Sequence, residues 1–223
     1  GELGKGLVVE PYLATVILGG ELIARYGSQA QRDEILPQIA AGEIMLTLAH
    51  AEPGARYDLH GIATKAAPSG DGYVINGAKG MVLNAAGADR IIIPARTSGD
   101  RSDKSGISLF LVNGDAPGLS RHDYKTYDGG RASELELTDV VVSDADLIGA
   151  LDQGHDALEE IMDHGLAALC AEAVGVMEVL FEATLEYLKT RKQFGRAIGE
   201  FQALQHRMSD MYMSLENARS MAF

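Results

Sequence analysis

Two long sets of apolar residues recur at alternating steps of three and four in the C-terminal third of the chain. The first set is Leu158, Met162, Leu166, Leu169, Ala173, Val176, Leu180, Ala183 and Tyr187, and the second is Phe201, Leu204, Met208, Met211, Leu215, Ala218 and Ala222. This spacing places each set on one face of a helix, so the pattern predicts a helical hairpin. Helices this long need a partner surface beyond each other. We therefore expect further bundle helices or a second subunit to complete the core.

The residues before the hairpin begin with a helical pattern at about residues 8–47. Pro11 suits a helix start, Gly27 interrupts the pattern, and Ser28 predicts the N-cap of the next helix. Gly42 then ends that helix.

Residues 48–150 are rich in turns and in short β-type runs, which predict a small antiparallel barrel or sandwich. Tyr73-Val74-Ile75 predicts a short strand, and Asn76-Gly77 predicts a hairpin turn after it. The predicted fold is therefore α+β. It has the end of a helical domain at residues 1–47, a middle β domain at 48–150, and the first helices of a bundle at 151–223.

The composition excludes several classes of protein. A formal net charge of -13 argues against non-specific nucleic-acid binding, and no apolar run is long enough to span a bilayer. The one cysteine, Cys170, allows no internal disulfide, which predicts a reducing, cytoplasmic compartment and a buried core thiol. The chain starts without Met and ends at Phe223 inside a helical pattern. We therefore expect it to be a piece of a longer polypeptide, trimmed at both ends.

A basic segment separates the two helical stripes of this acidic chain. Lys189, Arg191, Lys192 and Arg196 gather at the end of one helix, beside the aromatic ring of Phe194. Cationic side chains at a helix end attract anions. The segment is thus a plausible seat for an anionic, partly aromatic ligand, and a helix-end cation with a core aromatic is the alternative.

Five stretches, in this order, resemble segments of the acyl-CoA dehydrogenase family. They are Tyr26-Gly27-Ser28-Gln29-Ala30-Gln31-Arg32, Glu52-Pro53-Gly54-Ala55 with Asp58, Asn76-Gly77-Ala78-Lys79 with Asn84-Ala85, Leu137-Thr138-Asp139-Val140-Val141-Val142, and Arg191-Lys192-Gln193-Phe194-Gly195 with Gln202. The run His50-Ala51-Glu52-Pro53-Gly54-Ala55-Arg56-Tyr57-Asp58 also resembles the small subunit of pimeloyl-CoA dehydrogenase-type enzymes, which pairs with a large chain.

The resemblance implies FAD as cofactor, an acyl-CoA substrate and an electron-transfer flavoprotein as electron acceptor. It implies that residues 48–57 line the flavin and the thioester, with the cofactor contacts Leu48, His50, Ala51, Tyr57, Met81, Leu83, Arg191, Gln193, Phe194 and Gln202. Arg191 would reach the pyrophosphate of a neighbouring subunit's flavin, so the site would exist only in a homo- or hetero-oligomer. Arg56, Tyr57 and Leu166 fall at substrate-side positions.

The sequence also departs from the family pattern. Ala51 and Leu83 stand where the family carries hydroxyl side chains, and Leu166 stands where it carries an arginine. Gly165 occupies the position of one alternative catalytic glutamate, and the commoner one would lie beyond Phe223. A non-catalytic subunit that completes a partner's flavin site is therefore an alternative to an active dehydrogenase, and a flavin-free binding module is a third.

Several polar residues have a structural interpretation beside the chemical one. Glu52 is expected to hold its loop by hydrogen bonds rather than to act as an acid. His50 is expected to be a packed or a surface histidine, with a proton shuttle as the alternative. His122, His155 and His206 lack the spacing of metal ligands, so no metal site is predicted.

Overall fold

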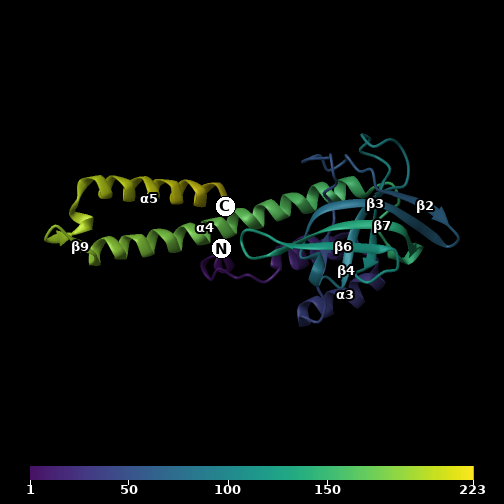
Figure 1. Ribbon diagram of the computed structural model, residues 1–223, viewed down its shortest axis with the longest axis horizontal. Coiled ribbons are helices and arrows are strands. Elements are labelled where there is room, and N and C mark those ends of the chain that lie inside the picture. The colour runs from purple at the N-terminus through teal and green to yellow at the C-terminus, as the bar shows by residue number, and fades with distance from the viewer. Residues whose placement is uncertain (223) are drawn as a thin grey trace. The chain divides into compact units, whose positions relative to one another are not determined.

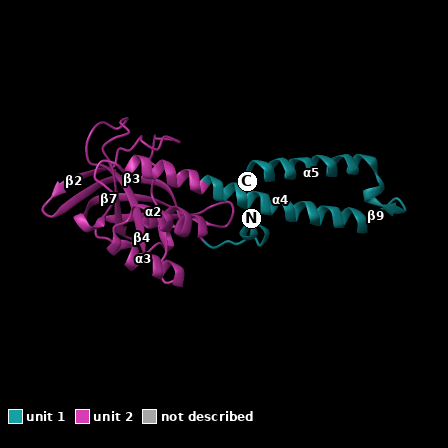
Figure 2. Cartoon of the chain, turned by 180° about the vertical axis from the view of Figure 1, so that it is seen from behind, with its two compact units in different colours: residues 1–10, 166–223 teal, residues 11–165 magenta. Residues whose placement is uncertain are grey.

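The computed structural model describes residues 1–222, which group into two compact units (Figure 2). Unit 2 is residues 11–165, and unit 1 is residues 1–10 together with 166–223, of which Phe223 is outside the described part. The domain boundaries at 47 and 150 stay predictions. None of the helices in residues 1–222 is long and apolar enough to cross a membrane.

The helices of unit 2 begin where the sequence predicts. A π-helix, η1 (Leu13–Gly20), runs into α2 (Glu21–Tyr26), and α3 (Gln29–Ala41) follows. Ser28 and Gln31 form a capping box, because the Ser28 hydroxyl accepts from the Gln31 backbone N–H and the Gln31 side chain accepts from the Ser28 N–H. Gly42 ends α3 with a φ of 73°. The predicted break and the predicted cap are both confirmed.

One eight-stranded sheet forms the rest of unit 2. Its strands run in the order β6 (Leu119–Lys125), β7 (Arg131–Ser143), β3 (Gly72–Leu83), β2 (Lys65–Ser69), β4 (Arg90–Arg96), β5 (Ile107–Asn113) and β8 (Leu147–Ile148), with β1 (Leu46–Leu48) paired to β4. Most pairings are antiparallel, but β1 and β2 both pair with β4 in parallel. The α+β class is confirmed, and the sheet is an open path of strands. Short helices η2 (Ala85–Gly87) and η3 (Asp144–Asp146) connect strands.

Strands β4 and β5 are buried on both faces, which explains their almost continuous apolar sequence. One face packs Ile92 and Leu109 against η1, α2, α3 and the start of α4 (Gly154–Thr190). The other face packs Ile91 and Phe110 against the apolar side chains of β3 and β7. Figure 1 shows α3 beside β4 and the strands β3, β6 and β7 together. The core on both faces of the sheet holds the C-terminal end of β1 in place. The candidate site begins at this end of the strand.

The predicted turn at Asn76-Gly77 is wrong. These residues lie inside β3, and the chain turns instead between Ser69 and Gly72. The pairing of β3 with β7 is irregular between Ile75 and Gly77, so the glycine marks a β-bulge rather than a hairpin.

We expect Gly77→Ala to destabilise the chain by about 2–3 kcal/mol, because the site is already full. A Cβ at Gly77, where φ is 156°, would lie 2.5 Å from Thr64 Oγ1 and 2.7 Å from Thr64 Cα. Gly70→Ala is the control: nothing lies within 4 Å of its Cβ, and only a left-handed φ of 58° opposes it, at about 1 kcal/mol. Urea unfolding measures both variants. Equal losses would contradict the steric explanation.

Unit 1 contains α1 (Glu2–Lys5), most of α4, the short strands β9 (Lys192–Gln193) and β10 (Arg196–Ala197), η4 (Ile198–Glu200) and α5 (Gln202–Ala222). Its few buried apolar side chains include Val174, Leu188, Met208 and Leu215. Exposed apolar side chains on its two long helices are Leu166, Leu169, Val179, Leu180, Tyr187, Tyr212, Met213 and Met221. The two predicted helices are confirmed, and this chain leaves much of their apolar surface uncovered.

Cys170 of α4 is also exposed. The prediction of a buried thiol is therefore wrong for the chain by itself. Its position in the helix, one residue after Leu169 on the stripe, turns it away from that stripe.

Candidate functional site

The segment that follows β1 carries the first group of predicted site residues. Ala49 extends the pairing with β4 by donating to the Ile92 carbonyl oxygen at 2.9 Å, so Leu48 is 4% exposed and rigidly held. After Ala51 the chain makes a turn in which the Ala55 N–H donates to the Glu52 carbonyl oxygen. The turn carries Arg56 and Tyr57 outward, away from the core.

Arg56 has a φ of 55°, and the next side chain, Tyr57, is fully exposed. A non-glycine residue in the left-handed region costs on the order of 1 kcal/mol, and such residues gather at functional sites. Arg56 and Tyr57, two of the three predicted substrate-side residues, are therefore displayed on the surface of unit 2.

The second group lies on β3, next to the first. The Gly80 N–H donates to the Ala51 carbonyl oxygen at 2.9 Å, and the Thr47 hydroxyl donates to the Leu83 carbonyl oxygen at 2.5 Å. The structure therefore brings residues 48–51 and 81–83 together, although they are far apart in the sequence. We call these two stretches the paired segments.

Met81 protrudes from the paired segments. The pairing of β3 with β7 is interrupted between Lys79 and Val82, Met81 has a φ of 51°, and its side chain is 65% exposed. A bulge re-aims side chains and often lies beside a functional site. Leu83, two residues later, is also exposed. Both side chains are apolar, so only backbone groups of this stretch could donate hydrogen bonds to a ligand.

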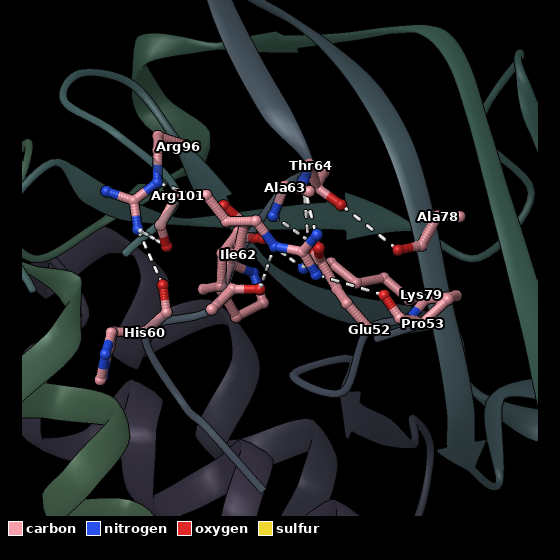
Figure 3. A network of polar contacts seen from close by, with 12 residues as sticks. Glu52, Pro53, His60, Ile62, Ala63, Thr64, Ala78, Lys79, Arg96 and Arg101 are labelled. Atoms are coloured by element: carbon pink, nitrogen blue, oxygen red, sulfur yellow. Dashed lines mark hydrogen bonds and ion pairs between the residues drawn. The ribbon is translucent and has the colours of Figure 1, made fainter. Parts of the chain in front are cut away.

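Beneath the paired segments lies an ion pair with almost no exposure (Figure 3). Lys79 Nζ lies 2.7 Å from Glu52 Oε1, and it also donates to the Pro94 carbonyl oxygen at 2.6 Å. Glu52 accepts from the backbone N–H groups of Ala63 at 2.6 Å and Thr64 at 3.1 Å. The expectation that Glu52 holds its loop is confirmed. The pairing partner, Lys79, was visible in sequence only as part of a motif.

Burial and the charge of its partner shift the pKa of each member of this pair. Burial lowers the pKa of Lys79 to about 8, even though Glu52 opposes that shift. Burial alone would raise the pKa of Glu52, but the charge of Lys79 and the hydrogen bonds from Lys79, Thr64 and Ala63 outweigh it and lower the pKa. At neutral pH, Glu52 is therefore a carboxylate.

We expect Glu52→Gln to flatten the acid limb of the stability curve. A carboxyl group whose pKa is lower in the folded state stabilises folding above its unfolded pKa, and this contribution is lost as pH falls through the folded pKa. The free energy of unfolding, measured in urea between pH 7 and pH 3, should thus fall more steeply for the wild type. Glu43→Gln, at an exposed position, controls for the change in net charge. Parallel curves for wild type and Glu52→Gln would contradict this assignment.

His50 lies in the first paired segment, and one of its ring nitrogens makes no hydrogen bond in the described part of the chain. Its Nδ1 is buried and has no hydrogen-bond partner among residues 1–222. Burial and the nearby charge of Lys79 lower the pKa of His50, so the imidazole is neutral at physiological pH. The packed interpretation is confirmed in that the ring is largely covered. A buried nitrogen without a hydrogen-bond partner is unusual in a folded protein.

Two arginines that sequence reasoning missed organise the loops around Glu52. The Arg96 guanidinium donates to backbone carbonyl oxygens, including His60 at 2.9 Å and Asp103 at 2.9 Å. Arg101 donates to the carbonyl oxygens of Gly61 and Pro53, each at 3.2 Å (Figure 3). A lone arginine at the end of the apolar strand β4 was the one available signal for Arg96.

The basic segment of unit 1 forms a tight hairpin. Gln193 pairs with Arg196, and the two residues between them, Phe194 and Gly195, have φ values of 55° and 81°. Positive φ at both positions identifies a type I′ turn, which usually carries Asn-Gly. Phe194 is 91% exposed in this conformation. The ring of Phe194 is thus exposed to solvent, on a residue whose left-handed backbone conformation is unfavourable for any residue with a Cβ.

A second aromatic ring, that of Phe201, lies beside Phe194 and contacts a cation. The guanidinium of Arg196 lies 4.2 Å from the ring centroid of Phe201, whose ring meets that of Phe194 edge-on at 6.1 Å. Arg191, Lys192 and Gln193 are exposed, as is Gln202 at the first position of α5. The hairpin offers positive charge and an aromatic face, as expected for a site that takes an anionic aromatic ligand.

The predicted site residues therefore fall into two sets. Unit 2 carries Leu48, His50, Ala51, Arg56, Tyr57, Met81 and Leu83, whereas unit 1 carries Leu166, Arg191, Gln193, Phe194 and Gln202. The structure brings members of each set together within their unit. Leu166 is 57% exposed on α4 and separate from the hairpin in sequence.

Gly165 of α4 lies against the side chain of Leu18 in η1. A Cβ at this position would lie 2.9 Å from Leu18 Cδ2, so the Leu18 side chain would have to move to admit a glutamate.

Two further features lie apart from the predicted site. His155, Asp156 and Glu159 have donor atoms within 4.8 Å of one another, but both carboxylates are exposed and the prediction of no metal site stays a prediction. A hollow of about 550 Å³ is lined by Tyr26, Lys104, Ser105, Ile148, Gly149, Ala150, Asp152, Gln153, Gly154, His155, Asp156 and Ala157. None of the predicted site residues lines it.

Models of known families match most of the chain. The acyl-CoA dehydrogenase middle domain matches residues 47–140, and the acyl-CoA dehydrogenase C-terminal domain matches residues 152–223. The probable acyl-CoA dehydrogenase YngJ of Bacillus subtilis (strain 168) is 36% identical over 225 residues, covering 99% of this chain and 59% of that protein.

Solved structures agree with these matches. Butyryl-CoA dehydrogenase from Megasphaera elsdenii superposes with a TM-score of 0.91 at 29% identity, covering 99% of this chain and 59% of that one. The FAD complex of PigA superposes with a TM-score of 0.89 at 32% identity, covering 94% of this chain and 55% of that one. The chain thus spans a little over half the length of these relatives.

Proposed function

This chain belongs to the acyl-CoA dehydrogenase family, and we propose on that basis that it is part of a flavin-dependent enzyme that dehydrogenates an acyl-CoA thioester between Cα and Cβ. The observation that carries the proposal is the meeting of the paired segments, residues 48–51 and 81–83, through the Gly80–Ala51 and Thr47–Leu83 hydrogen bonds. Both segments were predicted to face the flavin.

The residues present fit a flavin in three respects. The paired segments present an exposed apolar edge at Met81 and a buried His50 Nδ1 without a partner in the described chain. The hairpin of unit 1 presents Arg191 for a pyrophosphate and Phe194 for an aromatic ring. We propose that the paired segments hold the ring system of one FAD, and that Arg191, Gln193, Phe194 and Gln202 contact the FAD of a neighbouring subunit.

FAD, when bound, supplies the acceptor for the hydride that leaves Cβ of the substrate. The chain's own residues bind and orient. Backbone groups of the first paired segment, with His50, would position the reacting ring, and Arg56 and Tyr57 would meet the thioester side of the substrate or its phosphates. The carboxylate that removes the Cα proton is proposed to lie outside residues 1–223. An electron-transfer flavoprotein is the proposed electron acceptor.

A second function, that of a non-catalytic subunit in a heteromeric dehydrogenase, is favoured by specific residues. Ala51 and Leu83 offer no side-chain hydrogen bonds, and Gly165 supplies no carboxylate at the alternative position of the base. Such a subunit would lend Arg191 to its partner's flavin and would still need the paired segments for assembly.

The test is the visible absorption spectrum of the purified full-length protein, alone and co-expressed with a candidate partner chain. Flavin absorption that bleaches when acyl-CoA is added without oxygen would establish the dehydrogenase. Bleaching only in the presence of the partner would favour the subunit function. A colourless protein in every assembly would contradict both and leave a flavin-free binding module.

A further inference from the structure

Lys79 is the most completely buried charged residue of unit 2, and it lies at the foot of the bulge that carries Met81. Its side chain is 0% exposed, and that of its partner Glu52 is 2% exposed. Neither charged group can touch a ligand on the surface. Any effect on the candidate site must pass through the backbone that these side chains hold.

The partners of this pair come from four different parts of the chain. Lys79 belongs to β3 and donates to Pro94 of β4, while Glu52 follows the first paired segment and accepts from Ala63 and Thr64 before β2. Figure 3 shows Glu52 and Lys79 close to Ala63 and Thr64. The ion pair is therefore a cross-link between the strands and loops that surround the candidate site.

The cross-link acts directly next to the contact between the paired segments. Lys79 precedes Gly80, whose N–H donates to the carbonyl oxygen of Ala51, and Ala51 precedes Glu52. The backbone hydrogen bond and the side-chain ion pair thus join β3 to the segment after β1 at adjacent residues. One without the other would let the bulge slide or rotate relative to residues 48–51.

Stability alone does not account for a charged pair in this position. Removing two charges from water is costly, and a neutral or apolar pair of similar volume is often as stable. The pKa of Lys79 falls to about 8, so burial outweighs the attraction of Glu52. What a charged pair adds is a short, directional contact that a pair of methylene chains does not supply.

We propose that Lys79 and Glu52 are positioning residues that fix the paired segments in the arrangement required to hold the flavin ring. This inference rests on the proposed function, because it assigns the pair a role toward the same cofactor. Loss of the pair would change the surroundings of the ring without removing any group that touches it.

The experiment uses the full-length flavoprotein, with its partner chain if one is needed. Glu52→Gln and the double variant Lys79→Met/Glu52→Gln remove the ion pair while leaving side chains of similar size. The matched control is Glu34→Gln/Arg90→Met, which removes a partly exposed ion pair whose side chains, 60% and 30% exposed, lie 3.5 Å apart. Thermal unfolding and native mass establish that each protein is folded and assembled. The readouts are the FAD dissociation constant, the visible circular dichroism of bound FAD and the flavin midpoint potential.

We expect the folded site variants to bind FAD at least about tenfold more weakly, which is the lower end of what lost outer-shell support costs at metal sites. Their visible circular dichroism and midpoint potential should also change, while the control keeps wild-type values. Site variants with wild-type affinity, dichroism and potential would overturn the proposal. Failure of both site variants to fold, with an intact control, would assign the pair to stability and overturn it as well. Absence of flavin from the wild type would instead overturn the proposed function itself.

Discussion

Replacing Lys79 with methionine alone is expected to destabilise the folded chain by about 3–5 kcal/mol. The substitution removes a side chain that is 0% exposed and leaves the Glu52 carboxylate buried without its cation. Breaking one side of a buried ion pair is far more costly than replacing both sides, because the remaining charge has lost its solvation and its partner. The pair therefore resists single substitutions even if its net contribution to stability is small.

Urea unfolding at pH 7 measures this loss, with Lys65→Met as the control on the neighbouring strand β2. Lys65 is exposed, so its replacement should change the free energy of unfolding by no more than about 0.5 kcal/mol. Adding Glu52→Gln to Lys79→Met should recover a large part of the lost stability. A single variant as stable as the control would show that the Glu52 carboxylate does not need Lys79.

Replacing Arg191 with glutamine is expected to weaken FAD binding about 10- to 100-fold, because a hydrogen bond to a charged group contributes about 1.5–3 kcal/mol. The backbone should not change. The Arg191 N–H donates to the Tyr187 carbonyl oxygen at 2.8 Å, and its own carbonyl oxygen accepts from Ile198 at 2.9 Å. The exposed side chain takes no part in either bond, so the substitution tests the guanidinium by itself.

The control for Arg191 is Arg207→Gln, another exposed arginine of unit 1, whose nearest carboxylate is that of Asp210 at 3.6 Å. Fluorescence titration of the apoprotein with FAD gives the dissociation constants, and native mass confirms equal assembly. Equal FAD affinity in both variants would contradict a role for the hairpin in FAD binding. It would not bear on the role proposed for the paired segments.

Local signals in the sequence were sufficient for the helices. The N-cap at Ser28, the helix end at Gly42 and the two helices predicted from the apolar stripes each depend on residues close together in the chain, and each is confirmed. The Asn76-Gly77 signal also depends only on neighbouring residues, and this is why it failed. It describes a turn in a short peptide, whereas in the folded chain the Cα of Thr64 fills the space where a side chain at 77 would be.

The candidate site was predictable as a set of segments but not as an arrangement. Motif order placed residues 48–57 and 81–83 near a cofactor, yet nothing local revealed that Lys79 meets Glu52 or that Arg96 gathers the carbonyl groups of two loops. Such contacts depend on which strands become neighbours. Exposure of Cys170 was missed because a helical stripe does not say how much of the other faces is covered.

The parallel pairing of β1 with β4 has a consequence for the order in which the molecule acquires its structure. Leu46 pairs with Arg90, so the strand that leads into the first paired segment stays unpaired until β2, β3 and the start of β4 have been synthesised. Closing so long a loop is entropically costly, and non-local pairings of this kind form slowly. On a ribosome, the helices before β1 can form early. The paired segments can be fixed in place only after β4, which ends at Arg96, has emerged.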